Sequence, residues 1–365
     1  MGKTNHKPRS FYDPSKTYDD NFDSGPSQVF PDEKVYKNRG APKFSFLGRP
    51  LYLPFGIAAG PLPNSQYVKY AFERGFDAVC YKTQRSVAFK VNDFPNVLYV
   101  DVDGDLTLEK AKKPLVGKSQ TTKPLKQLSI TNSFGNPSRG PAFWLPDTKK
   151  ALSYQGRGQL LISSVVGTIK AGFSGEDYFN DFAKAAKLAA STGVEAIEIN
   201  LSCPNVASEG ILCYTYDSVV SIVGKVKKVI GDLPLIVKLG YYSADQNQLL
   251  ARIVKAIAPS TAAISTINTI PAPVVDENGN QALPGKGRLM SGICGASVKW
   301  AGLEMVKKLD GLRKKQGYSF EIIGIGGVMS PKDFHDYRQA GADLVQSCTG
   351  AMWNPNLAAE IKATL

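Results

Sequence analysis

The chain has 365 residues, of which 43% are hydrophobic and 21% are charged, and its net charge at pH 7 is +12. This composition excludes an intrinsically disordered chain, and the length allows two medium domains or one large α/β barrel. The basic residues are scattered, with no basic–aromatic cluster or nucleic-acid motif, so the positive charge does not indicate nucleic-acid binding.

The five cysteines are Cys80, Cys203, Cys213, Cys294 and Cys348. They form no C-x-x-C pair and no zinc spacing, which predicts no metal or iron–sulfur site. The chain has neither a signal-peptide pattern nor an apolar run long enough to cross a membrane. We therefore expect a cytoplasmic protein with reduced thiols and no membrane anchor.

Two regions follow from the pattern of residues along the chain. Residues 1–42 are polar, with several Asp, Gly, Pro and Ser, and we expect an extended N-terminal tail, either free or folded over the body of the protein. Residues 43–365 have the character of a folded domain, which opens with a predicted β-hairpin from Phe44 to Tyr52.

From the hairpin onward, strand-like and helical patterns alternate. The eight strand-like runs are Leu53–Ile57, Ala78–Tyr81, Leu161–Val165, Ala196–Ile199, Leu235–Leu239, Ala263–Thr266, Ile322–Ile325 and Leu344–Ser347. The helical patterns are Gln66–Arg74, Glu176–Ser191, Ser218–Ile230, Ala244–Ile257, Ser297–Lys315, Pro331–Ala340 and Asn356–Ala363. Eight such units predict an α/β protein with a closed (β/α)8 TIM barrel. The segment 83–160 is too long for a simple connection and predicts an inserted lid or subdomain between strands 2 and 3.

Chemistry in such a barrel gathers at the C-terminal ends of the strands. Lys82 and Lys238 directly follow apolar strand residues, where a lysine needs an anion or a polar partner. Gly326-Gly327 follows the seventh strand, where it is compatible with a mere turn or with a phosphate-binding turn.

The fourth strand runs into Asn200, Ser202, Cys203 and Asn205. Cysteine can transfer a proton, and Asn amides offer paired donors and acceptors. The strand end is equally compatible with a segment that merely leaves the core. Neither histidine of the chain falls at a strand end, and no G-x-G-x-x-G follows an early strand, so histidine catalysis and a nicotinamide domain are not indicated.

Nine motifs in fixed order carry a further signal. They are Phe55–Gly60, Tyr81–Thr83, Thr131–Gly135, Ile199–Asn205, Pro234–Leu239, Ile267–Thr269, Ser291–Gly295, Ile323–Gly327 and Leu344–Gln346. Together these motifs resemble the dihydroorotate dehydrogenase family, specifically its class 1 enzymes, and the Asn-Leu-Ser-Cys-Pro-Asn stretch is the most distinctive of them.

The resemblance implies oxidation of dihydroorotate to orotate in de novo pyrimidine biosynthesis, with FMN bound on the barrel. Cys203 would be the base that removes the C5 proton while the C6 hydride passes to flavin N5, and Lys82 would act between flavin and substrate. The membrane-associated class 2 enzymes have serine in place of this cysteine. Fumarate as a soluble electron acceptor and a homodimer are further expectations from the family.

The resemblance also assigns the binding residues. The substrate-binding set is Lys82, Asn132, Phe134, Gly135, Asn136, Asn200, Asn205, Asn268 and Thr269. The cofactor-binding set is Ala58, Ala59, Gly60, Lys82, Thr83, Asn132, Asn200, Lys238, Thr269, Gly295, Gly326, Gly327, Cys348 and Thr349. No residue is assigned to a metal.

Some positions depart from the family pattern. Class 1 enzymes usually read Asn-Ser-Met-Gly-Leu-Pro-Asn in the insertion, whereas this chain has Asn136 and Ser138 at two of those positions. Cys348 stands where Gly is common, and Thr269 where Ser is frequent. These departures keep two alternatives open: a dihydropyrimidine dehydrogenase-like flavoprotein acting on a related dihydropyrimidine, and a catalytically silent flavin- or pyrimidine-binding protein.

Overall fold

The computed structural model describes residues 10–26, 35–170, 172–202 and 212–365. Eight parallel strands close into a barrel in the order β10-β11-β12-β13-β16-β17-β3-β4. Their bounds are β3 Phe55–Ile57, β4 Ala78–Gln84, β10 Leu160–Val165, β11 Ala196–Asn200, β12 Leu235–Lys238, β13 Ala263–Thr266, β16 Glu321–Ile325 and β17 Leu344–Ser347. The predicted (β/α)8 barrel is confirmed.

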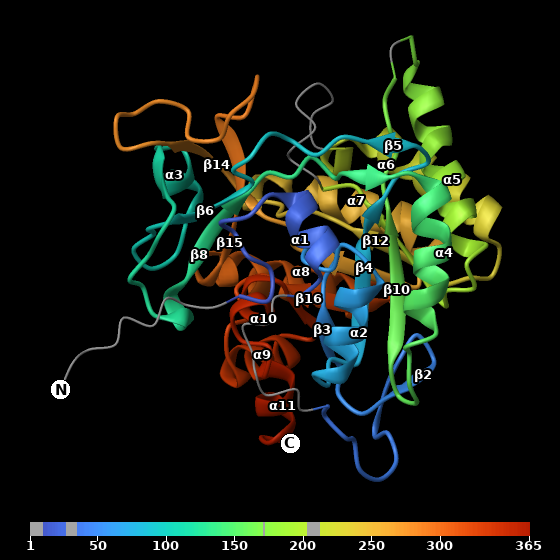
Figure 1. Cartoon of the computed structure of the whole chain (residues 1–365). Coiled ribbons are helices and arrows are strands. Elements are labelled where there is room, and N and C mark those ends of the chain that lie inside the picture. The colour runs from blue at the N-terminus through green and yellow to red at the C-terminus, as the bar shows by residue number, and fades with distance from the viewer. Residues whose placement is uncertain (1–9, 27–34, 171, 203–211) are drawn as a thin grey trace.

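Helices surround the barrel (Figure 1). Seven of them match the helical patterns of the sequence with small shifts at their ends: α2 Ser65–Glu73, α5 Gly175–Ala190, α6 Tyr216–Ile230, α7 Asn247–Ile257, α8 Lys299–Gln316, α9 Pro331–Gln339 and α11 Leu357–Lys362. The described chain also contains α1 Tyr18–Ser24, α3 Leu108–Ala111, α4 Pro141–Leu152 and α10 Thr349–Trp353.

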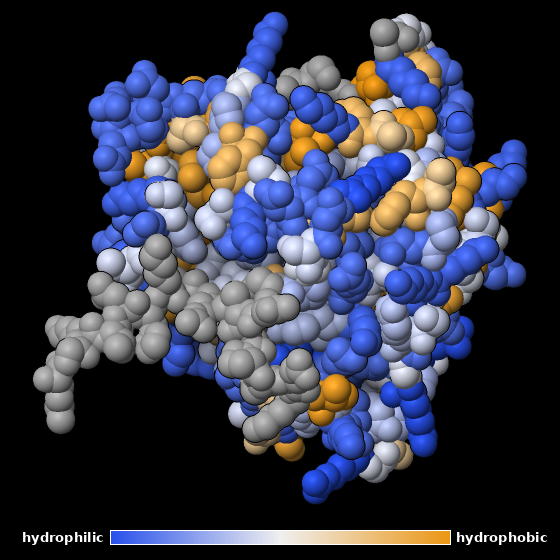
Figure 2. Space-filling model, viewed as in Figure 1, coloured by the Kyte–Doolittle hydropathy of each residue, from blue (hydrophilic) through white to orange (hydrophobic). Residues whose placement is uncertain are grey.

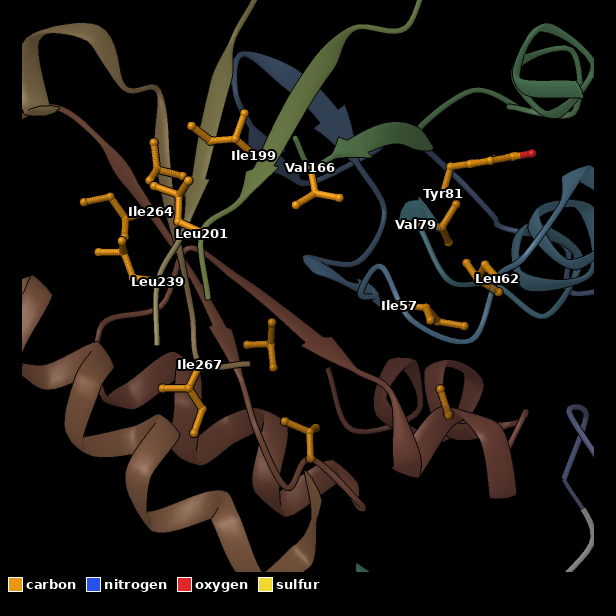
Figure 3. Close-up of a cluster of buried hydrophobic side chains, with 14 of the residues drawn as sticks. Ile57, Leu62, Val79, Tyr81, Val166, Ile199, Leu201, Leu239, Ile264 and Ile267 are labelled. Atoms are coloured by element: carbon orange, nitrogen blue, oxygen red, sulfur yellow. The ribbon is translucent and has the colours of Figure 1, made fainter. Parts of the chain in front are cut away.

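Alternation of side chains along each strand divides the core in two. Outward-facing residues such as Ile57, Val79 and Ile264 join the larger cluster between the strands and the helices (Figure 3). Their inward-facing neighbours, among them Ala78 and Cys80, form a separate buried cluster inside the barrel. The barrel interior is therefore filled by side chains up to its C-terminal end.

The predicted hairpin closes the opposite end of the barrel. Strands β1 (Phe44–Phe46) and β2 (Arg49–Leu51) pair antiparallel, and Phe46 and Leu51 belong to the interior cluster. The backbone N–H of Leu47 donates to the Glu321 carboxylate at the start of β16, at 2.6 Å. With the N-terminal end closed, the C-terminal end is the face left for a ligand.

A second, five-stranded closed sheet lies beside the barrel (Figure 1). Strands β6 (Val97–Val100), β7 (Leu115–Lys118) and β8 (Ser129–Asn132) come from the connection between β4 and β10. Strands β14 (Ile270–Val275) and β15 (Met290–Gly295) come from the connection between β13 and β16. The sequence predicted a subdomain in the first connection but not the second contribution, since β8 and β15 pair across a long sequence separation.

The N-terminal segment differs from the expected extended tail. Within its described part, α1 is a helix that begins with a capping box between Thr17 and Asp20. The side chains of Phe11, Tyr12 and Phe22 are buried against the body of the protein. Residues Tyr18–Ser24 are therefore helical instead of extended, and the segment folds over the body of the protein because burial of its aromatic side chains is favourable.

The surface in Figure 2 is largely hydrophilic, with groups of hydrophobic residues in its upper part. Among the helices of the described residues, none has the length and apolar character required to cross a membrane.

Candidate active site

A pocket opens at the C-terminal end of the barrel. The empty space between its walls, with the open mouth included, amounts to about 1120 Å³. Its walls come from the ends of the barrel strands, from the second sheet and from the N-terminal segment. The pocket therefore brings together residues that lie far apart in the sequence.

The strand pleat aims the two predicted lysines into this pocket. Lys82 follows Cys80 on the inward face of β4, and Lys238 is the last residue of β12, where it pairs with Asn200 of β11. The two lysines are only 5% and 4% exposed. Both cations thus stand at the top of the barrel interior, as the sequence predicted.

Lys82 is held between a carbonyl and aromatic rings. Its Nζ donates to the Gly60 carbonyl at 3.0 Å. It also lies 4.9 Å from the ring centre of Phe134 and 5.7 Å from that of Tyr18. Such ring contacts attract an ammonium that is largely removed from water.

Lys238 has no hydrogen-bond or ion-pair partner within the part of the chain that the structure describes. A buried cation in such a position favours an anionic or electron-rich ligand. Its charge acts on nearby groups: burial raises the pKa of the Cys348 thiol to about 11, and Lys238 partly opposes that rise. The barrel interior beneath contains the buried Glu198 carboxylate, which accepts a hydrogen bond from Ser164 Oγ at 3.0 Å.

Three side-chain amides line the pocket, and in each of them one of the two polar atoms already has a partner within the protein. Asn200 Oδ1 accepts from the backbone N–H of Ser202 at 3.2 Å. Asn268 Nδ2 donates to the Ser202 carbonyl at 3.0 Å, and Asn132 Nδ2 contacts Cys294 Sγ at 3.5 Å. Among the described residues this leaves Asn200 Nδ2 as a free donor and the Oδ1 atoms of Asn132 and Asn268 as free acceptors. The site can therefore read both donors and acceptors on a ligand ring.

Two further pocket residues carry buried polar atoms without a partner in the described chain, Asn136 Nδ2 and Thr269 Oγ1. Each such atom costs about 1–3 kcal/mol when it stays unpaired. A polar ligand that pairs with these atoms recovers this cost, so both atoms are candidate ligand contacts.

The loop from Asn132 to Asn136 is fixed by two buried arginines. Arg85 donates from Nε to the Asn136 carbonyl at 2.9 Å and from Nη2 to the Gly135 carbonyl at 3.3 Å. Arg288 donates from Nη2 to the Ser133 carbonyl at 2.8 Å. Because the carbonyls are held, the unusual φ of +50° at Asn136 is maintained and its side chain remains in the pocket.

The cofactor side of the pocket is built on glycines. Gly327 has a φ of +64°, and a Cβ there would lie 2.7 Å from Lys299 Cβ. A Cβ on Gly350 would lie 2.1 Å from the Val328 carbonyl oxygen. The turn after β16 and the start of α10 therefore pack closely against their neighbours, and both line the pocket. We call this glycine-rich backbone the glycine cradle; backbone of this kind beside a pocket is compatible with a phosphate group.

The structure brings most of the predicted site residues together. Those that line the pocket are Ala59, Gly60, Lys82, Asn132, Phe134, Gly135, Asn136, Asn200, Lys238, Asn268, Thr269, Gly295, Gly326, Gly327, Cys348 and Thr349. Ala58 instead packs in the barrel interior, and the Thr83 hydroxyl bonds Ser164 at 3.0 Å. Cys203 and Asn205 lie outside the described residues.

Ser138, which the sequence placed on the substrate side, does not line the pocket. Its hydroxyl donates to Gln84 Oε1 at 2.8 Å and accepts from the Gly140 N–H at 3.2 Å. The two-residue pairing of β5 (Ala88–Phe89) with β9 (Ser138–Arg139) turns it away from the pocket. Of the two positions that differ from the family pattern in this loop, Asn136 lines the pocket and Ser138 does not.

Several pocket residues were missed from the sequence: Tyr12, Tyr18, Pro61, Val97, Ile130, Cys294, Ile325, Val328, Met329, Ser347, Gly350 and Met352. The aromatic residues of the N-terminal segment could have indicated that it packs against the protein, because aromatic side chains are unfavourable in a solvent-exposed tail. The described residues contain no group of three or more His, Cys, Asp or Glu side chains placed to hold a metal ion.

A closed (β/α)8 barrel with cations, amides and a glycine cradle at its C-terminal end has the architecture of an enzyme active site. The family profile described as dihydroorotate dehydrogenase matches residues 112–365. The chain is 36% identical over 359 residues to dihydroorotate dehydrogenase of Dictyostelium discoideum, and this match covers 96% of each chain.

Two bacterial proteins match a shorter stretch. The catalytic subunit of dihydroorotate dehydrogenase B (NAD(+)) from Petrotoga mobilis is 36% identical over 171 residues, which is 47% of this chain and 53% of that subunit. The same subunit from Desulforudis audaxviator is 30% identical over 181 residues, 50% of this chain and 56% of that one. The chain belongs to the dihydroorotate dehydrogenase family. The predicted flavin-dependent oxidoreductase is confirmed at this level.

Proposed function

We propose that this chain oxidises dihydroorotate to orotate in pyrimidine biosynthesis, with FMN as its bound flavin. The observation that carries the proposal is the single pocket in which Lys238, the three amides and the glycine cradle meet. An anionic, planar cofactor and a small polar ring satisfy this set of groups better than any hydrolysable substrate, since the described pocket offers no metal cluster and no histidine.

The residues present fit FMN at both of its ends. The backbone around Gly326, Gly327 and Thr349 would hold the phosphate, and a side chain at Gly327 would displace this turn because it would clash with Lys299. Lys238 would face the flavin ring and favour negative charge on it. Once bound, FMN supplies the acceptor for the hydride that leaves C6 of the substrate.

The substrate would lie against the amides and Lys82. Asn132, Asn200 and Asn268 orient the ring through their free donor and acceptor atoms, and Lys82 attracts the carboxylate. Cys203 would take the C5 proton. Its role rests on the sequence motif and on its place three residues beyond Asn200, which ends β11 in the pocket. Asn205 would complete the substrate contacts.

The expected setting of the reaction also comes from the family resemblance. We propose a cytoplasmic homodimer that passes its electrons to fumarate. The nearly full-length relative is named simply as dihydroorotate dehydrogenase, whereas the bacterial subunits named for NAD(+) match about half of this chain. Re-oxidation of the reduced enzyme by fumarate, compared with NAD(+) and a quinone, tests the acceptor.

A second candidate function is oxidation or reduction of a related dihydropyrimidine. Asn136 favours this candidate, because its unpaired Nδ2 lines the pocket where the family usually has an apolar Leu. The third candidate is a protein that binds a flavin or a pyrimidine without catalysis. The two buried lysines in the pocket argue against this candidate.

The decisive experiment is anaerobic mixing of the purified yellow protein with dihydroorotate. We expect the flavin absorbance to bleach and orotate to form in equal amount. Bleaching by dihydrouracil alone would favour the second candidate, and no bleaching by either would favour the silent binder. A colourless protein that cannot be reconstituted with FMN would contradict the flavin assignment itself.

A further inference from the structure

The N-terminal segment supplies part of the pocket that the barrel does not provide. Tyr12 and Tyr18 both line the pocket and are buried. Their rings lie 5.7 and 5.9 Å from the ring centre of Phe134, which belongs to the loop held by the two arginines. We call Tyr12, Tyr18 and Phe134 the aromatic wall.

The aromatic wall stands over the Lys82 ammonium. Phe134 and Tyr18 both lie within cation–π distance of Nζ, and the Gly60 carbonyl accepts from it on another side. Two rings against an ammonium occupy space that water would otherwise fill. A charge with less water around it attracts an anion more strongly, since the effective dielectric constant is lower.

Charged and aromatic contacts hold this segment in place. Arg139 pairs with Asp19 at 3.2 Å and with Asp23 at 2.8 Å, and its guanidinium lies 3.7 Å from the ring centre of Phe22. We call this contact set around Arg139 the latch. It joins α1 to β9, outside the pocket lining.

Hydrogen bonds to the barrel add to the latch. The Asn64 Nδ2 donates to the Phe22 carbonyl at 2.7 Å, and the Tyr67 hydroxyl donates to the Asn21 carbonyl at 2.9 Å. At the other end of the segment, the Phe11 N–H donates to the Met352 carbonyl at 3.0 Å. The segment is therefore docked at both of its ends, with the two tyrosines between or beside these anchors.

We propose that residues 10–26 are an integral wall of the substrate site and that Tyr18 determines its selectivity for an anionic ring. Tyr18 acts through Lys82: its ring excludes water from the ammonium and keeps that charge directed at the substrate carboxylate. The inference rests on the proposed function, because the carboxylate belongs to dihydroorotate and orotate. A neutral pyrimidine of the same shape gains nothing from this arrangement.

The test is calorimetric binding of orotate and of uracil to the oxidised FMN-loaded enzyme. Tyr18→Leu removes the ring face, and we expect it to weaken orotate binding by about tenfold while uracil binding changes by less than about twofold. Tyr18→Phe keeps the ring and is the matched control, with both affinities within about twofold of the wild type. Higher salt should weaken orotate binding more in Tyr18→Leu than in the wild type, because its ammonium is more exposed.

A second variant tests whether the effect of Tyr18→Leu comes only from a local rearrangement around residue 18. Arg139→Gln breaks the latch from outside the pocket and should shift orotate affinity in the same direction, whereas Arg49→Gln, in the hairpin at the other end of the barrel, should not. Unchanged orotate affinity in both Tyr18→Leu and Arg139→Gln would overturn the inference, as would equal losses for orotate and uracil. A wild-type enzyme that fails to bind orotate would instead overturn the proposed function.

Discussion

The two sides of the pocket are assembled in different ways. The barrel side takes its residues from the ends of parallel strands, where Lys82, Asn200 and Lys238 line the pocket and Asn200 is paired with Lys238. The opposite side combines the loop around Phe134 with the N-terminal segment. The geometry of a parallel barrel places the residues at its strand ends, which we call the rim. The opposite side of the pocket depends on contacts between segments that are distant in the sequence. We therefore expect the rim to carry the chemistry and the opposite side to select the ligand.

Removal of the buried cation of the rim should have the largest effect. Lys238→Met deletes the charge that faces the proposed flavin ring, and we expect flavin reduction by dihydroorotate to slow by about 10²–10³-fold. Anaerobic stopped-flow absorbance measures the rate. Lys228→Met on the exposed part of α6 is the control and should leave the rate unchanged. If Lys238→Met reduced its flavin as fast as the wild type, Lys238 would have no role in the reaction.

The loop on the opposite side should respond through stability. Arg85→Met leaves the carbonyls of Gly135 and Asn136 without their donors, and we expect the free energy of unfolding to fall by about 3 kcal/mol. Thermal and urea unfolding measure this loss. Arg85→Lys should recover little of it, because one ammonium cannot reproduce the guanidinium fork. A variant with wild-type stability would show that the loop does not depend on this clamp.

Substrate choice should follow the residue that faces the pocket. Asn136→Leu removes the unpaired amide, and we expect it to raise the ratio of kcat/KM for dihydroorotate over dihydrouracil by about tenfold. Ser138→Ala should leave this ratio within about twofold, because that hydroxyl bonds Gln84 and Gly140 instead of a ligand. A larger shift in Ser138→Ala than in Asn136→Leu would reverse the assignment.

The smallest effect concerns the rim thiol beside the cradle. Burial raises the pKa of Cys348 to about 11, so its reactive thiolate should increase with pH throughout the range below that value. Alkylation of Cys348, followed by peptide mass spectrometry from pH 8 to pH 10, should rise about tenfold per pH unit without a plateau. A plateau near pH 8.5, the value of an ordinary thiol, would contradict the buried environment.

The difference between the two sides also explains what could be predicted from the sequence. Lys82 and Lys238 could be singled out because each directly follows an apolar strand run, and the end of such a run is a local property of the chain. The positions of β14 and β15 could not be predicted in this way, since their partners β7 and β8 lie far away in the sequence. Ser138 was misplaced for the same reason: the β5–β9 pairing that turns it away is not encoded in its neighbours.

The N-terminal segment was the larger omission. Its polar composition predicted a tail, while Phe11, Tyr12, Tyr18 and Phe22 are too few among polar residues to produce a strong apolar pattern. Their burial depends on partners such as Phe134, Phe143 and Tyr67, which only the folded barrel brings into reach. Composition alone therefore underestimates a segment whose few aromatic residues are buried against the rest of the protein.

The division of labour between the two sides can be tested in one measurement. Single-turnover flavin reduction, recorded over a range of dihydroorotate concentrations, separates the limiting rate from the apparent Kd. We predict that Lys238→Met lowers the limiting rate with little change in Kd, and that Tyr18→Leu raises Kd with the limiting rate nearly unchanged. The opposite pattern, with a slow limiting rate in Tyr18→Leu and a weakened Kd in Lys238→Met, would contradict the account.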